Sequence, residues 1–378
     1  MNVVLQYLHL LLLIPFLDHA SSNTIPVFNA IYSFGSSYED AGNMAILAPT
    51  APGFWNVLNP PYGETFFNLP TGRASDGRLV IDRIADYLGF SFIPPSLAQG
   101  QDFSKGANFA IFGSTALNYT FFQQNNIRNT HLHNTSLSVQ IEWFENQKPS
   151  ICNTTCVEHF TKSLFALGKF GDNDYLYMLS GGKTIEFVNS TVPVVVETIR
   201  SAAERLLKQG VMHLVVAGVR PNGCVPVVLT NFASTNRSDY DSLGCLKVYN
   251  NIGIYHNTLL CSAVKQLRLE FPQAKISFSE HYKPLIDFVS NPSKYGFTSG
   301  TQLRACCGTG EPYNYNLLAS CGHAGVPACP NPSTFINWDG IRLTDAAYDI
   351  IADGWLKGPY ADPPILDLPI LDLPIFVL

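Results

Sequence analysis

Residues 28–35 read FNAIYSFG, a short apolar run that ends at a glycine. A run of this length that stops at a turn residue is typical of a strand buried on both faces of a sheet. Further apolar runs lie at residues 109–112, 163–167, 212–217 and 274–278, and the first three of these also end at a glycine. The pattern therefore predicts a set of buried strands that lead into tight turns.

Stretches with apolar residues at helical spacing separate these runs. We expect helices at residues 81–88, 194–209, 247–270, 283–290 and 344–356, with Pro193 in the first turn of the second helix. Strands that alternate with helices predict a parallel sheet covered on both faces, which is an α/β fold. In open sheets of this kind, sites form outside the carboxyl ends of the strands.

The composition is that of a globular protein with a large core. The chain has 378 residues, of which 46% are hydrophobic and 14% charged. The net charge of -6 is mild, and no basic run of five or more residues occurs, which argues against nucleic acid as a partner. We expect a monomer that acts on a small molecule and needs no cofactor.

The N-terminus has the pattern of a secretory signal. Residues 1–20 contain an apolar stretch followed by His19 and Ala20, which predicts a signal peptide with cleavage near Ala20. The alternative is a membrane anchor, but an apolar run of about ten residues is too short to span a bilayer. We therefore expect an extracellular or vacuolar protein without stable membrane insertion. Five Asn-x-Ser/Thr sequons are candidate glycosylation sites: Asn118, Asn134, Asn153, Asn189 and Asn236.

The nine cysteines agree with an oxidising compartment. The local pairs Cys152–Cys156 and Cys224–Cys245 are the favoured disulfides, and the remaining connectivity is open. Cys261 is the candidate free thiol because it falls within an expected helix. No CxxC pair and no histidine pair at ligand spacing occurs, so we expect no metal site.

We expect one domain over residues 21–360, because no linker rich in proline and glycine divides the chain. Residues 361–378 then form a tail in which residues 363–374 repeat a five-residue unit. Prolines in this repeat prevent a continuing helix, so we expect a disordered extension, with a hydrophobic C-terminal sorting signal as the alternative.

Four turns carry the side chains suited to chemistry. They are residues 34–43 (FGSSYEDAGN), 106–114 (GANFAIFGS), 168–175 (GKFGDNDY) and 339–342 (DGIR). Together with residues 61–67, 70–79, 221–226 and 306–316, they resemble the plant GDSL esterase/lipase family of SGNH hydrolases. The resemblance covers nearly the whole chain after the signal, and the flanks are most similar to the branch that contains acetylajmalan esterase, a deacetylase of indole alkaloid metabolism. It implies a three-layer α/β/α sandwich with a flavodoxin-like parallel sheet.

The resemblance also assigns roles residue by residue. The nucleophile of the family's first motif falls on Ser37, whose backbone N–H also serves the oxyanion hole. The other oxyanion donors fall on the backbone of Gly113 and the side-chain amide of Asn173, each worth about 3–4 kcal/mol in a comparable hydrolase. Asp339 falls on the acid that orients the base, and the histidine base itself falls on Arg342.

Each of these residues has a simpler structural alternative. Ser37 and Asn173 are also ordinary turn residues, and Gly113 suits a turn that needs a positive φ. Asp339 can serve as a helix cap or as the ion-pair partner of Arg342.

This chain departs from the family pattern at four site positions. Arg342 replaces the base, and an arginine stays protonated and has no lone pair to accept a proton. In the first motif, Ser36 replaces an aspartate and Tyr38 replaces a leucine, while Phe112 replaces a small residue before Gly113. The departures cluster in motifs that form the site wall, which suggests a reshaped site.

Two functions from different classes follow. The first is an ester hydrolase of specialised metabolism with weakened or rearranged catalysis, in which His281, near the carboxyl edge of the sheet, is the candidate replacement base. The second is a non-hydrolytic binder or cyclase-like catalyst, in which the planar fork of Arg342 binds a carboxylate or an oxyanion. The sequence does not name the substrate.

Overall fold

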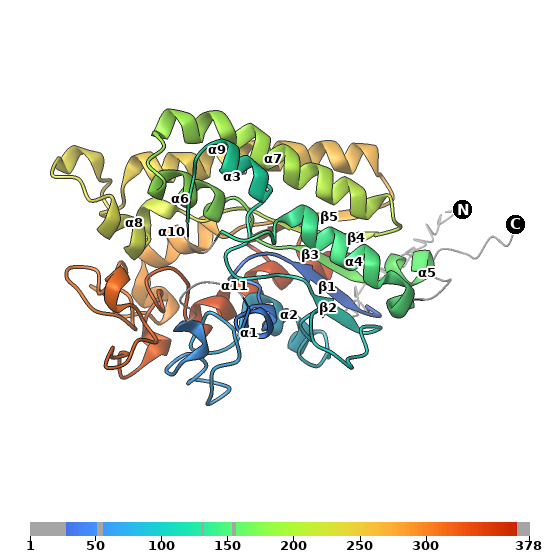
Figure 1. Ribbon diagram of the computed structural model, residues 1–378, viewed down its shortest axis with the longest axis horizontal. Helices are drawn as coiled ribbons and strands as arrows, with labels where there is room; N and C mark the ends of the chain where they lie inside the picture. The colour runs from blue at the N-terminus through green and yellow to red at the C-terminus, as the bar shows by residue number, and fades with distance from the viewer. Residues whose placement is uncertain (1–27, 51–55, 130–131, 153–155, 369–378) are drawn as a thin grey trace, which may run out of the picture.

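The computed structural model describes residues 28–50, 56–129, 132–152 and 156–368. The expected signal peptide, the sequon at Asn153 and the last part of the tail lie outside these ranges. Figure 1 shows a central sheet with helices above and below it.

The described residues form a six-stranded sheet with the strand order β2-β1-β3-β4-β5-β6. All neighbouring strands run parallel except β6, which pairs antiparallel with β5. The strands are β1 (Ile31–Phe34), β2 (Gly106–Asn108), β3 (Leu164–Leu167), β4 (His213–Ala217), β5 (Lys275–Ser279) and β6 (Ala361–Asp362).

The helices connect the parallel strands and pack on the sheet. They are α1 (Asn43–Leu47), α2 (Val80–Tyr87), α3 (Tyr119–Gln124), α4 (Leu137–Cys152), α5 (Cys156–Thr161), α6 (Asp172–Ser180), α7 (Ile185–Leu207), α8 (Pro226–Asn231), α9 (Lys247–Glu270), α10 (Tyr282–Ser290) and α11 (Asp345–Lys357). None of the described helices is long and apolar enough to cross a membrane.

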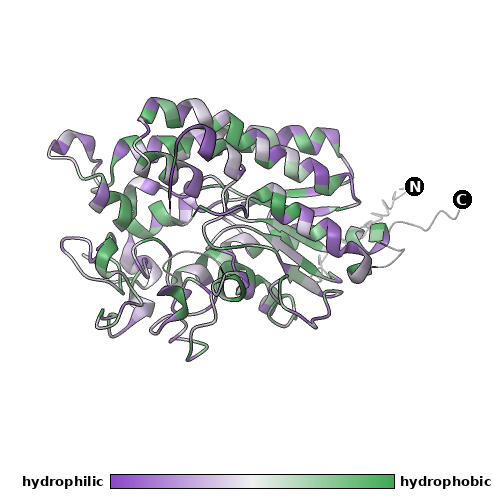
Figure 2. Ribbon diagram, viewed as in Figure 1, coloured by the Kyte–Doolittle hydropathy of each residue, from purple (hydrophilic) through white to green (hydrophobic). Residues whose placement is uncertain are grey.

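Two apolar cores lie on opposite faces of the sheet. Tyr32, Phe165 and Leu214 are neighbours across β1, β3 and β4, and they pack in the core that includes α7 and α9. Ile31 and Leu164 point to the other face and pack in the core that includes α2 and α11. Figure 2 shows the strands as predominantly hydrophobic, while the helices carry both hydrophobic and hydrophilic residues. The alternation of side chains along buried strands therefore supplies both cores.

Two elements differ from the sequence prediction. The second strand is residues 106–108, and the apolar residues 109–112 after it are a buried loop held by the Asn43 side chain, which donates to the carbonyls of Asn108 and Ala110. Helix α7 begins at Ile185, where the Thr184 side chain caps it, so that Pro193 lies inside the helix instead of in its first turn. Burial of Val192, Val195 and Val196 offsets the hydrogen bond that a proline removes.

The domain also extends beyond residue 360, where the sequence analysis placed its end. Residues 361–362 form β6, and Ile365 and Leu368 are fully buried in the core with α11. The expectation of a disordered tail is therefore wrong for residues 361–368. Prolines exclude a continuing helix but allow an extended segment, and the apolar residues between them can pack into the core. We call residues 361–368 the strap.

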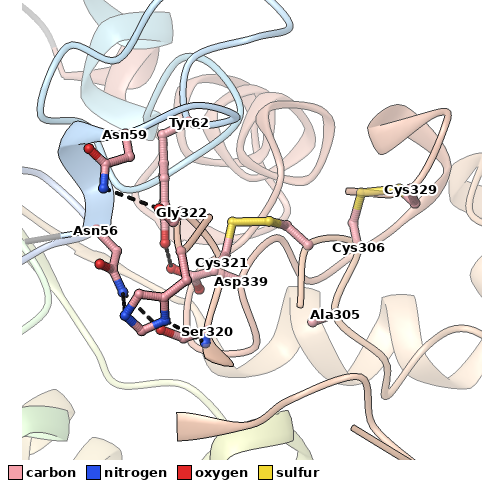
Figure 3. Close-up of a disulfide and its surroundings, with 12 residues drawn as sticks. Asn56, Asn59, Tyr62, Ala305, Cys306, Ser320, Cys321, Gly322, Cys329 and Asp339 are labelled. Carbon is pink, nitrogen blue, oxygen red and sulfur yellow. Dashed lines mark hydrogen bonds between the residues drawn. A yellow bond between two sulfur atoms is a disulfide. The ribbon is translucent and has the colours of Figure 1, made fainter. Parts of the chain in front are cut away.

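Four disulfides join eight of the cysteines, and Cys261 is free, as expected. The pairs are Cys152–Cys156, Cys224–Cys245, Cys306–Cys329 and Cys307–Cys321. The two local pairs favoured by the sequence are both present. The other two close the loop of residues 306–329, which lies beside the segment around Asn56 (Figure 3).

Truncation tests the strap directly. A chain that ends at residue 360 loses the burial of Ile365 and Leu368, each worth about 1.5–3 kcal/mol, so we expect a markedly lower melting temperature. The matched control ends at Leu368 and keeps every described contact of the strap. Thermal unfolding measures both, and equal melting temperatures for the two truncations would contradict the packing role.

Candidate active site

The four turns of interest meet at one end of the sheet, as the carboxyl ends of parallel strands require. Ser37 follows β1, Gly113 follows β2, and Asn173 lies in the first turn of α6 after β3. Asp339 and Arg342 come from the loop before α11, and that loop reaches Ser37 through a direct hydrogen bond.

Ser37, Arg342 and Asp339 form a continuous chain of polar contacts. The Nε–H of Arg342 donates to Ser37 Oγ over 3.2 Å, and Arg342 Nη1 donates to Asp339 Oδ2 over 2.9 Å. All three residues are buried, with exposed fractions of 4% for Ser37 and Asp339 and 8% for Arg342. The structure thus brings together the expected nucleophile, the expected acid and the arginine at the position expected for the base.

The two charges of this chain stabilise each other. Burial alone would raise the pKa of the Asp339 carboxyl, but the charge of Arg342 and the hydrogen bond from Tyr62 hold it below its ordinary value. Burial alone would lower the pKa of Arg342, but Asp339 raises it. Arg342 is therefore held as a cation, and it cannot accept the Ser37 proton.

The Asp339 carboxylate also forms hydrogen bonds within its own loop. Its Oδ1 accepts from the backbone N–H groups of Ile341 and Arg342 at 2.9 and 2.7 Å. Its Oδ2 accepts from the hydroxyl of Tyr62 at 2.7 Å as well as from Arg342. Asp339 is thus the ion-pair partner of Arg342, one of the two structural alternatives. It is not a helix cap, because the side chain of Thr344 caps α11.

Phe112 supports the arginine from the other side. The guanidinium carbon of Arg342 lies 4.1 Å from the centroid of the Phe112 ring, which is a cation–π contact. Two departures from the family pattern, Phe112 and Arg342, therefore touch each other.

The N–H groups of Ser37, Gly113 and Asn173 that are expected to serve as oxyanion donors remain available in the structure. Within the described part of the chain, no group accepts a hydrogen bond from the backbone N–H of Ser37 or of Gly113. Gly113 has φ 82°, a conformation that favours glycine. The side-chain amide of Asn173 donates one N–H to the carbonyl of Ser114 at 2.8 Å, which leaves its other N–H for a ligand.

His281, the candidate replacement base, does not reach Ser37. Its ring is fully buried and packs edge-on against Tyr38 at 5.6 Å and against Trp355 at 5.0 Å. Neither ring nitrogen has a hydrogen-bond partner among the described residues, and burial, with the nearby charge of Lys169, lowers the pKa of His281 to about 3. The expected rescue is therefore wrong, because the side chain is buried behind Tyr38.

Tyr62 is a site residue that the sequence analysis did not single out. Figure 3 shows how its segment is held. The side chains of Asn56 and Asn59 donate hydrogen bonds to Ser320 and Gly322 in the disulfide-closed loop. Tyr62 lies three residues after Asn59, and its hydroxyl points at Asp339. The Cys307–Cys321 disulfide fixes that loop. In the sequence, Tyr62 stood out only as part of the family motif at residues 61–67.

A buried group of charged side chains beside the turn that carries Ser37 was also missed. Lys169 pairs with Asp172 over 2.6 Å, and Arg220 approaches the same carboxylate at 3.4 Å. Glu39 accepts from the backbone N–H groups of Ser36 and Lys169. Glu39, Lys169 and Arg220 lie in turns that follow strands, and Asp172 is the first residue of α6, so their position was a signal that the sequence offered.

The remaining sequence predictions concern glycosylation and metal binding. The sequon residues Asn118, Asn134, Asn189 and Asn236 are all exposed, as a glycosylation site requires. Among the described residues, no group of three or more His, Cys, Asp or Glu side chains lies close enough together to hold a metal ion.

Comparison with known proteins identifies the class that this geometry suggests. A family model described as GDSL-like Lipase/Acylhydrolase matches residues 31–355. The Arabidopsis thaliana protein GDSL esterase/lipase At5g45910 is 39% identical over 371 residues, which cover 94% of this chain and 99% of that protein. GDSL esterase/lipase At1g28590, from the same plant, is 41% identical over 345 residues, which cover 89% of this chain and 84% of that protein.

The chain therefore belongs to the GDSL-like lipase/acylhydrolase family. Its class is that of carboxylic ester hydrolases, enzymes that act on ester bonds.

Glu39 gives a pH-dependent prediction. Burial raises its pKa from 4.5 to about 7, so the folded protein holds this proton more tightly than the unfolded chain. The stabilising contribution is complete below about pH 4.5 and is lost as the pH rises to about 7. Glutamine does not ionise, so the melting temperature of Glu39→Gln relative to wild type should rise between these pH values. The exposed Glu158→Gln is the control, and a difference for Glu39→Gln that stays constant with pH would contradict the assignment.

Proposed function

We propose that this protein hydrolyses a small carboxylic ester by a weakened serine mechanism, because Arg342 stands where the family has its histidine base. The direction of one hydrogen bond carries the proposal. Arg342 Nε–H donates to Ser37 Oγ, so the residue beside the nucleophile supplies a proton donor and not an acceptor.

The remaining parts of the site still favour acyl transfer. The Arg342 charge lies beside Ser37 Oγ and favours its alkoxide, while Ser37, Gly113 and Asn173 offer donors to an oxyanion. The proton of Ser37 must then pass to water or hydroxide. Loss of the histidine from a working triad costs on the order of a millionfold in turnover, while the oxyanion hole and binding retain roughly a thousandfold over water.

The structure supports a reshaped site over random loss. A buried arginine without partners would be strongly destabilising, but Arg342 has Asp339, Phe112 and Ser37 around it. Tyr38, another departure, donates to the carbonyl of Ile341 next to Arg342. The departures therefore accommodate one another.

We also propose a location and a metabolic setting. The N-terminal signal pattern, the four disulfides and the exposed sequons support a glycosylated protein of the secretory pathway, either extracellular or vacuolar. The motifs shared with the acetylajmalan esterase branch support a role in plant specialised metabolism. Apolar cores on both sheet faces support the three-layer arrangement of the family.

A second candidate is a non-hydrolytic binder or cyclase-like catalyst on the same fold. The observation in its favour is that no described residue accepts a hydrogen bond from Nη2 of Arg342. This nitrogen can donate to a carboxylate or an oxyanion of a bound molecule. In that case Ser37 is an orienting residue and forms no acyl-enzyme.

Two substitutions separate the candidates in an assay with p-nitrophenyl acetate. We expect Ser37→Ala to abolish the weak activity of the wild type, and Arg342→His to raise kcat by about tenfold or more, since a base contributes 10²–10⁴-fold when well placed. The control Arg342→His/Asp339→Asn should lose the gain because the imidazole is no longer oriented by a carboxylate. Activity that survives Ser37→Ala would exclude the serine mechanism, whereas the absence of hydrolysis in the wild type would favour the second candidate.

The pH profile provides an independent test. Without a base near neutral pKa, the wild-type rate should keep rising with pH as hydroxide removes the Ser37 proton. In Arg342→His the rate should level off once the imidazole is neutral, near its ordinary pKa of about 6.5. Initial rates between pH 5 and 9 distinguish the two shapes, and a wild-type plateau near neutrality would reveal a base other than residue 342.

A further inference from the structure

We infer that Tyr38 and Arg220 are positioning residues that hold the Arg342 loop against the turn that carries Ser37. The inference concerns the geometry on which the proposed serine mechanism rests. It does not require either side chain to touch a substrate, since Tyr38 and Arg220 are each only 1% exposed.

The contact between the two loops is a triangle of hydrogen bonds. The Tyr38 hydroxyl donates to the backbone carbonyl of Ile341 at 3.0 Å. Arg220 Nη1 donates both to that same carbonyl and to the Tyr38 hydroxyl oxygen. Tyr38 follows Ser37 directly in the chain, and Ile341 precedes Arg342 directly, so the triangle joins the neighbours of the two residues that meet in the site.

This arrangement fixes the peptide plane between Ile341 and Arg342. The carbonyl of that peptide accepts from Tyr38 and Arg220, while its N–H, which belongs to Arg342, donates to Asp339 Oδ1. Both ends of the peptide unit are therefore held by side chains. The direction in which the Arg342 side chain leaves the backbone, and hence its contact with Ser37 Oγ, depends on that plane.

Arg220 is itself held in place by buried partners. Its Nε donates to Asn222 Oδ1 at 3.1 Å and lies 3.4 Å from Asp172. Asn222 in turn donates to Asp172 at 2.7 Å. A buried guanidinium with this many partners has little freedom to move, which is what a positioning group needs.

The ring of Tyr38 is also held by its neighbours. The ammonium of Lys169 lies 4.0 Å from the ring centroid, and the rings of His281 and Tyr348 pack edge-on against it. The family's first motif has a leucine at this position, and a leucine has no hydroxyl to donate to Ile341. The tie between the two loops therefore needs the tyrosine that this chain has at position 38.

The test removes only the hydroxyl. Tyr38→Phe keeps the ring and its packing, so the variant should fold, but it loses the bond to Ile341. Hydrogen–deuterium exchange followed by mass spectrometry should show residues 337–343 exchanging about tenfold faster, with the remaining peptides unchanged. The matched control is Tyr32→Phe, which removes a buried hydroxyl that bonds to Phe103 and His159, away from this loop.

A kinetic measurement adds a readout that a purely structural role would not move. In the Arg342→His background, Tyr38→Phe should lower kcat by about tenfold to a hundredfold and leave KM unchanged, because small misplacements of a reacting group have effects of this size. Arg220→Lys keeps the charge beside Asp172 but not the fork, and should act in the same direction.

The outcomes are separable from those of the proposed function. Exchange of residues 337–343 is measured without any substrate, so it remains informative if no hydrolysis is found. If Tyr38→Phe lowers the melting temperature but leaves both loop exchange and kcat as in Tyr32→Phe, the positioning role is excluded and Tyr38 is only a core residue.

Discussion

The buried ion pair between Arg342 and Asp339 is the interaction on which the rest of the site depends. A guanidinium that is 8% exposed needs a nearby carboxylate and enough hydrogen-bond acceptors to replace water. Asp339 supplies the charge, the Ser37 hydroxyl supplies an acceptor, and the Phe112 ring covers one face. Arg342 is therefore the residue around which these buried groups are arranged.

A second group of buried acidic and basic side chains lies beside the turn that carries Ser37. Glu39, Lys169, Asp172 and Arg220 are buried together, and they comprise two acidic and two basic side chains. Their backbone and side-chain contacts join the first turn, the third turn and the segment after β4, as when Glu39 accepts from the N–H of Lys169. The carboxyl ends of the strands are thus held together by polar contacts, and the apolar cores on the sheet faces hold the strands themselves.

Much of this was predictable from the sequence because it follows local patterns. The strands before Gly35, Gly168 and Gly218 and the long helix α9 follow from hydrophobic periodicity and glycine stops. The start of α7 and the strap after residue 360 were missed, since in both cases burial against the core outweighs a local signal from proline. Tyr62 and Arg220 were missed for another reason. They join the site through Asp339 and Ile341, which lie 277 and 121 residues further along the chain.

The position of His281 shows how such long-range contacts decide function. His281 follows a strand, so the sequence predicts that it lies near the site at the carboxyl edge of the sheet. In the structure the Tyr38 ring lies against it, and burial lowers its pKa and keeps it neutral. The same Tyr38 ties the Arg342 loop to the nucleophile turn. Tyr38 therefore packs against the buried His281 and also bonds to the loop that carries Arg342, so one side chain of the first turn constrains both residues.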